Sequence, residues 1–164
     1  FCALHRPQNR LTVINGCESG MIRPDRVDEL VGLPSGFLYA GATCVLSTLW
    51  SVYDLSSALL VNRFHQEWLG DDPEDPHSGL SVAAALREAQ RWLREDVVSG
   101  PYLQKEILPG LLEGLNSVSL RQVCERQAQL YAEKYPDTPP FAAPVHWAAL
   151  VAVGLGYPLP PAAS

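Results

Sequence analysis

The run from Leu11 to Asn15 is mostly apolar and β-branched, and it leads the chain directly to Cys17. Such a run is typical of a buried strand, and α/β folds place their chemistry at the carboxyl ends of parallel strands. Backbone N–H groups that converge on a thiol there can stabilise a thiolate and, during acyl transfer, an oxyanion. The same spacing also fits a small apolar residue that closes the strand. The pattern therefore indicates an α/β fold and leaves two roles open for Cys17.

Strand-like and helix-like patterns alternate along the rest of the chain. Helices are predicted over 33–40, 55–69, 80–97 and 119–135, and further strands over 43–49 and 145–153. Gly41 is expected to end the first helix and Asp54 to cap the second. The run 43–49 has no polar break, as in a strand that is buried on both faces. Residues 70–79 are expected to form an exposed connector, whereas 99–116 fit no single element. The order of elements predicts a crossover connection.

Composition excludes several classes of function. The 164 residues are 47% apolar, which suits one domain with a sizeable core. A net charge of −6 without a long Lys/Arg run argues against nucleic acid or an anionic membrane as partner. The apolar stretches, such as Ala148 to Leu155, are too short to cross a bilayer. The chain begins at Phe1, so we expect it to be part of a longer protein.

The cysteines suggest a reducing compartment. They are widely separated and include no C-x-x-C pair: Cys2, Cys17, Cys44 and Cys124. A zinc site or a disulfide framework is therefore not expected, and neither a metal nor a cofactor is implied. The natural location is the cytoplasm.

Five segments are informative together: 15–20 (Asn-Gly-Cys-Glu-Ser-Gly), 32–42, 47–54, 80–93 and 147–154. In composition and order they resemble the C-terminal half of a CHAT domain, a caspase-like module that often follows TPR repeats. The resemblance implies an α/β fold with a mostly parallel sheet flanked by helices and an antiparallel last strand over 145–153. Residues 1–157 would form this partial domain, and 158–164 a flexible tail.

The resemblance also implies the chemistry of a cysteine endopeptidase. Cys17 would attack a peptide carbonyl, and its own backbone N–H would stabilise the oxyanion. Asp54 would lie beside the pocket for the side chain before the cleaved bond and would favour a basic one. Trp50 would be a wall of this pocket or a core residue. Tyr53 stands where many relatives have a second acidic residue, which weakens the expected preference.

The histidines depart from the family pattern. Caspase-type enzymes carry the base about 50 residues before the cysteine, and only His5 precedes Cys17 here. His5 begins the strand that Cys17 ends, so the strand rise places it more than about 20 Å from the thiol. We expect His65 and His77 to be solvated and His146 to be packed.

Two functions remain open at this stage. The chain is either the cysteine-bearing half of a peptidase whose histidine lies upstream, or a degenerate or truncated CHAT module that acts as a non-catalytic interaction or scaffold domain. The first would bind a peptide or protein substrate and follow TPR repeats in the same polypeptide. In either case we expect the 164 residues alone to be inactive, because a thiol without a base has little catalytic power. The role of 99–140 is undetermined.

Overall fold

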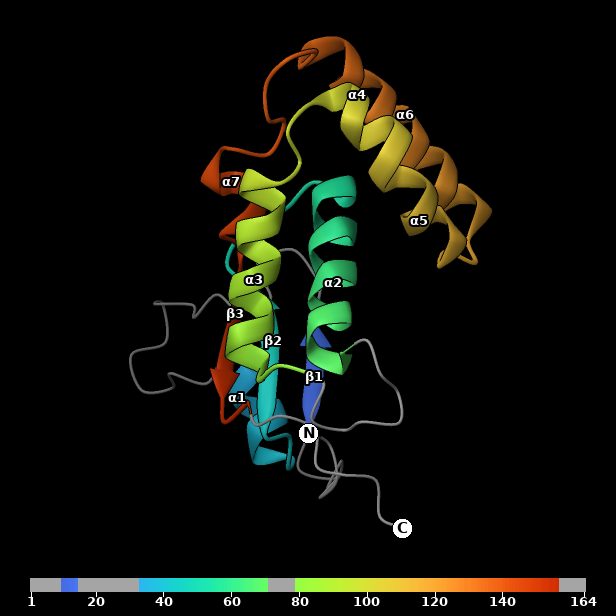
Figure 1. The fold of residues 1–164 in the computed structure, drawn as a ribbon. Helices are drawn as coiled ribbons and strands as arrows, with labels where there is room; N and C mark the ends of the chain where they lie inside the picture. Colours follow the sequence, from blue (N-terminus) through green and yellow to red (C-terminus); the bar gives the residue numbers. More distant parts are fainter. Residues whose placement is uncertain (1–9, 15–32, 71–78, 157–164) are drawn as a thin grey trace.

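The computed structural model describes residues 10–14, 33–70 and 79–156 (Figure 1). Its elements follow the order β1 (Leu11–Ile14), α1 (Leu33–Tyr39), β2 (Cys44–Thr48), α2 (Asp54–Leu69), α3 (Val82–Glu95), α4 (Gly100–Tyr102), the π-helix η1 (Leu103–Ile107), α5 (Leu108–Glu113), α6 (Val118–Lys134), α7 (Pro144–Trp147) and β3 (Leu150–Gly154). The predictions for Cys17, His5, His77 and the tail 158–164 concern residues outside these ranges and stay predictions.

The described strands form one sheet in the order β1-β2-β3. β1 pairs with β2 in parallel, from Leu11 opposite Cys44 to Ile14 opposite Ser47. β3 pairs with β2 in the antiparallel sense. Every residue of β2 is buried, as the uninterrupted β-rich run predicts. The expected α/β fold, with helices on the sheet and an antiparallel last strand, is confirmed.

The core lies between the sheet and the helices α2 and α3, which run side by side (Figure 1). The stripe predicted for α3 is buried: Val82, Leu86, Ala89 and Leu93. The facing side of α2 contributes Leu55, Leu59, Leu60 and Phe64. Burying each of these larger side chains is worth roughly 1.5–3 kcal/mol against leaving it exposed. This packing fixes the direction of α2, and with it the position of the loop that enters α2 from β2.

Local signals set the helix ends. The Ser81 hydroxyl accepts a hydrogen bond from the backbone N–H of Ala84 and starts α3. Gly41 and Gly70 follow α1 and α2 with positive φ angles of 104° and 77°, a conformation that glycine adopts without strain. The predicted ends of these two helices are therefore confirmed.

Residues 99–116, which the sequence left undetermined, are largely helical. α4, η1 and α5 form one segment, and α6 runs back beside it (Figure 1); residues 100–134 are called the arm below. Proline cannot donate a backbone hydrogen bond, and in a regular α-helix its ring crowds the carbonyl four residues earlier. The wider π-turn ends directly before Pro109, with the N–H of Leu108 donating to the carbonyl of Leu103. Gly100 has no side chain to separate the helices, and its N–H donates to the carbonyl of Tyr135 at 2.8 Å.

The strand predicted over 145–153 is only half right. Pro144 begins the short helix α7, and the N–H of Ala148 donates to the carbonyl of Pro144 at 2.8 Å. The strand β3 starts later, at Leu150. Proline suits the first turn of a helix because an N–H at that position would have no partner within the helix. Pro144 therefore favours a helical turn where the apolar pattern alone had predicted a strand.

Candidate functional site

The candidate site lies at the carboxyl edge of the parallel pair β1 and β2. Because Ile14 is the register partner of Ser47, the two strands end side by side. β1 leads into residues 15–32, which include Cys17 and lie outside the described part of the chain. β2 leads into Leu49 to Tyr53, called the loop below, and then into α2. The position of Cys17 at this edge stays a prediction.

Trp50 belongs to the loop and is partly buried. Its indole Nε1–H donates to the carbonyl of Val145 at 3.2 Å. One residue earlier, the N–H of Leu49 donates to the carbonyl of Ala149 at 2.9 Å. These two bonds hold the loop against α7 and the start of β3.

Asp54 is exposed and is the first residue of α2, so the prediction that it caps this helix is wrong. Tyr53 occupies the N-cap position and has no capping side-chain bond. Instead the Oε1 of Gln127, on α6, accepts a hydrogen bond from the N–H of Leu55 at 3.0 Å. The Asp54 carboxylate still lies at the positive end of the helix dipole, where an anion is stabilised.

One face of α6 approaches the start of α2. Cys124, Gln127 and Tyr131 are spaced three and four residues apart and therefore share a side of the helix. Burial raises the pKa of the Cys124 thiol, and the negative charge of Asp54 raises it further. The arm thus contacts the candidate site directly, through residues that the sequence gave no reason to select.

A cluster of rings joins the loop to the arm. The ring of His146 lies 5.3 Å from those of Tyr53 and Phe141 and 6.2 Å from that of Tyr131, measured between centroids. Burial, and secondarily the charge of Lys134, lowers the pKa of His146. Burial raises the pKa of Tyr131 to about 12. The prediction that His146 is packed is confirmed.

Two further polar side chains differ from simple expectation. The Oγ of Ser47 is buried at the end of β2 and has no hydrogen-bond partner. The prediction that His65 is solvated is wrong. Its Nδ1 lies 2.8 Å from the carbonyl oxygen of Val61, and its ring packs edge-on against Phe64.

The described cysteines are free and buried. Burial raises the pKa of the Cys44 thiol, with a smaller opposing effect from the N–H of Val45. A high thiol pKa means little thiolate and therefore low reactivity. Within residues 10–14, 33–70 and 79–156, no group of three His, Cys, Asp or Glu residues is arranged to hold a metal ion. In the same ranges no helix is long and apolar enough to span a bilayer.

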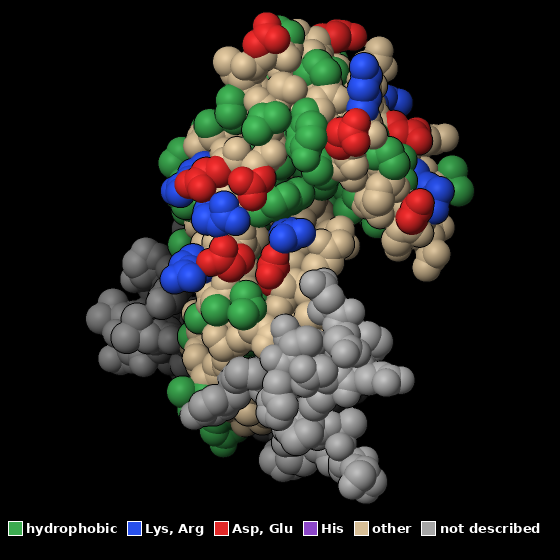
Figure 2. Space-filling model, viewed as in Figure 1, with side chains coloured by type: hydrophobic (Ala, Val, Ile, Leu, Met, Phe, Trp, Pro, Cys, Tyr) green, Lys and Arg blue, Asp and Glu red, His purple; other side chains and the backbone are tan. Residues whose placement is uncertain are grey.

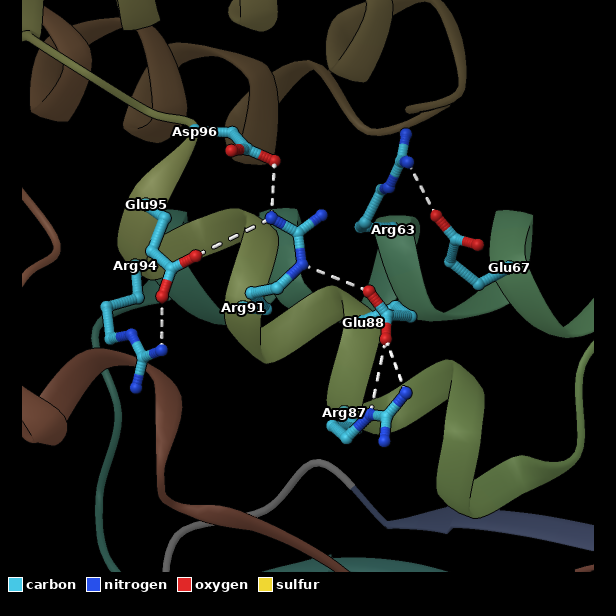
Figure 3. Close-up of polar contacts among 8 residues, drawn as sticks. All are labelled: Arg63, Glu67, Arg87, Glu88, Arg91, Arg94, Glu95 and Asp96. Carbon is cyan, nitrogen blue, oxygen red and sulfur yellow. Dashed lines mark hydrogen bonds and ion pairs between the residues drawn. The ribbon is translucent and has the colours of Figure 1, made fainter.

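The charged face of α3 is a separate surface. Acidic and basic side chains alternate across the middle of the molecule in Figure 2. Arg91 contacts the carboxylates of Glu88, Glu95 and Asp96 at 3.0, 3.6 and 3.5 Å (Figure 3). Exposed pairs of this kind contribute little to stability. Because the charges neutralise one another, this face favours solubility over the binding of a charged ligand.

Taken together, the fold and the edge define an α/β protein with a candidate site where two parallel strands end. The family model of the CHAT domain matches residues 1–155. The chain therefore belongs to the CHAT domain family, as its motifs predict. No curated protein and no solved structure matches the chain.

Proposed function

We propose that the chain provides the nucleophile and part of the substrate pocket of a CHAT-type cysteine endopeptidase. Cys17 attacks the carbonyl carbon of a peptide bond, the C–N bond breaks, and the amine half leaves with the proton that the thiol gave to the base. Water then hydrolyses the thioester formed with the acyl half, which releases the carboxylic acid and restores the thiol. The base is a histidine upstream of the 164 residues. The 164-residue chain alone is therefore inactive.

The observation that supports the proposal is the parallel register of β1 and β2. It brings the strand that leads to Cys17 beside the strand that leads to Trp50 and Asp54. A nucleophile and the pocket for the neighbouring substrate side chain need this proximity, since the side chain before the cleaved bond lies a few ångströms from the attacked carbonyl.

Asp54 provides the proposed specificity. Its carboxylate is exposed at the start of α2 and can pair with an arginine or lysine side chain of the substrate. Trp50 is tied to Val145 and serves as a fixed wall of the pocket. The substrate class is therefore a peptide or protein with a basic residue before the cleaved bond.

The test is hydrolysis of fluorogenic peptides with basic, acidic or apolar residues before the cleaved bond, using the intact protein. We expect turnover of the basic peptides, and Cys17→Ala abolishes it whereas Cys2→Ala, which removes another thiol, does not. Asp54→Asn reduces the preference for basic over apolar peptides about tenfold or more, as expected for a hydrogen bond between charged groups. Activity that persists in Cys17→Ala contradicts the proposal.

A second candidate function is a non-catalytic interaction or scaffold module. It is favoured by the described histidines, since His146 is enclosed by rings and His65 is bonded within its own helix. Under this alternative no peptide of the panel is cleaved, and an upstream segment lacks a strand that ends in His-Gly.

The proposed surroundings follow from the family and from the thiols. We place TPR repeats upstream in the same polypeptide as the region that selects partners. The free state of Cys44 and Cys124 supports a reducing compartment, and we assign the protein to the cytoplasm.

A further inference from the structure

His146 is the most unusual polar residue among those described. Its side chain is only 7% exposed, and its Nδ1 is buried without a hydrogen-bond partner. Buried polar atoms in proteins are nearly always bonded, so an unpaired one requires an explanation.

The surroundings of His146 suggest a mechanical role. The rings around it come from three separate segments: Tyr53 from the loop, Tyr131 from α6 and Phe141 from the connection before α7. The imidazole therefore lies where the arm, the loop and α7 meet. Tyr53 is 55% exposed, and its ring packs against that of His146.

Protonation changes the energetics of this junction. The imidazolium carries N–H donors on both nitrogens, and the Nδ1–H would then be buried without an acceptor. Ring faces attract a cation but provide no lone pair for this N–H. A charged, buried and unpaired group is far costlier than a neutral one.

The charged and titratable groups that face His146 do not offset this cost. α6 presents the phenol of Tyr131 and the ammonium of Lys134, the loop presents the phenol of Tyr53, and Arg94 of α3 lies over the ring of the next residue, Trp147. The ion pairs found in the described part of the chain do not include His146. The charge of Lys134 lowers the pKa of His146, whereas the carboxylate of Asp54, which follows Tyr53 at the start of α2, is not among the groups that shift it.

We propose that His146 is a pH-sensitive latch, whose neutral ring holds the loop against the arm and whose protonated ring releases it. The loop carries Trp50 and leads directly to Asp54, the two residues assigned to substrate above, so the latch would regulate the same site. The latch does not depend on peptidase activity, and its test needs none.

The sign follows from the lowered pKa of His146. An open state, in which the ring meets water, binds the proton near the ordinary pKa of about 6.5. The latch is therefore fully closed above about pH 6.5, and it weakens as the pH falls below this value toward the lower pKa of the closed state.

The test is amide hydrogen exchange of the intact protein between about pH 7.5 and pH 5, corrected for the intrinsic pH dependence. The reporters are the N–H groups of Leu55 and Ser57, which are bonded to Gln127 and Tyr53. We expect their protection to fall at the acid end relative to the amides of β2, because the open state binds a proton that the closed state binds less tightly. His146→Phe keeps a ring of similar size and abolishes this pH dependence.

His65→Gln is the matched control, since it removes another partly buried histidine and should leave the pH dependence as in the wild type. The proposal is overturned if His146→Phe retains the wild-type dependence, or if the wild-type reporters do not respond to pH. Should His146→Phe not fold, the His146 ring is titrated by NMR in the wild type. A midpoint that differs from that of the reporters also overturns the latch.

Discussion

The amide oxygen of Gln127 on α6 accepts a hydrogen bond from the backbone N–H of Leu55, 3.0 Å away in the first turn of α2. The first N–H groups of a helix have no partner within the helix, and a residue just before it usually supplies one. Here the partner comes from the arm. The start of α2, where Asp54 lies, is therefore positioned by a contact with a distant part of the chain.

Removing this cap should destabilise the protein. Gln127→Ala leaves the N–H of Leu55 without its acceptor, and we expect a loss of about 1 kcal/mol in the free energy of unfolding, as for other helix caps. Gln122→Ala on the exposed side of α6 is the matched control and should change little. Urea denaturation compares the two, and equal stability of both variants would contradict the assigned role of Gln127.

The cysteines should differ in reactivity toward alkylating agents. Cys44 and Cys124 are buried, and burial raises the pKa of both thiols, so we expect them to react slowly in the folded protein. Cys17 should react faster if it lies among converging N–H groups at the strand end. Competitive alkylation with mass-spectrometric detection measures each site. Equal labelling of Cys17 and Cys44 would contradict the assignment of Cys17 as nucleophile.

Gly154 should not tolerate a side chain. Its φ is +109°, and a Cβ added there would lie 2.4 Å from the carbonyl oxygen of Thr43. Gly154→Ala should therefore cost more than about 2 kcal/mol through strain and backbone contact. Gly110→Ala is the control, because its Cβ meets nothing within 4 Å and a helical glycine gains up to about 1 kcal/mol on this change. Thermal melts that shift alike would refute this reading of β3.

The phenol of Tyr131 should ionise at a higher pH than an ordinary tyrosine side chain. Burial raises its pKa to about 12, so between about pH 10 and pH 12 the unfolded chain loses this proton while the folded chain keeps it. Folding is therefore weakened as the pH rises through this window. In a titration of phenolate absorbance against pH, the step at the highest pH should disappear in Tyr131→Phe and remain in Tyr102→Phe. If Tyr131→Phe keeps that step, Tyr131 is not the phenol with the raised pKa.

Sequence patterns correctly predicted the structural features that depend only on residues close together in the chain. The stripe of α3 repeats at helical spacing, the uninterrupted run of β2 reflects burial on both faces, and Gly41 and Gly70 end helices by their own conformational freedom. Each of these features is decided within a few residues. The family motifs added the antiparallel last strand, because they recur in a fixed order.

The features that the sequence did not predict depend on distant partners. Asp54 fits a cap by its type, but Gln127, 72 residues after Leu55, takes that role. The apolar run before β3 fits a strand, but Pro144 and the bond from the Trp147 indole to the carbonyl of Ala142 favour a helical turn. The unpaired nitrogen of His146 likewise results from rings that the fold brings together.

The pairing of β2 with β3 has a consequence for the order of folding. It joins residues about a hundred positions apart, whereas α2 and α3 are neighbours in the chain. Contacts between distant segments must offset a larger loss of chain entropy, so they form late. A growing polypeptide that has been synthesised only as far as the arm can form the α2–α3 pair but has no partner for the second side of β2. The candidate site would thus be completed only after β3 has emerged.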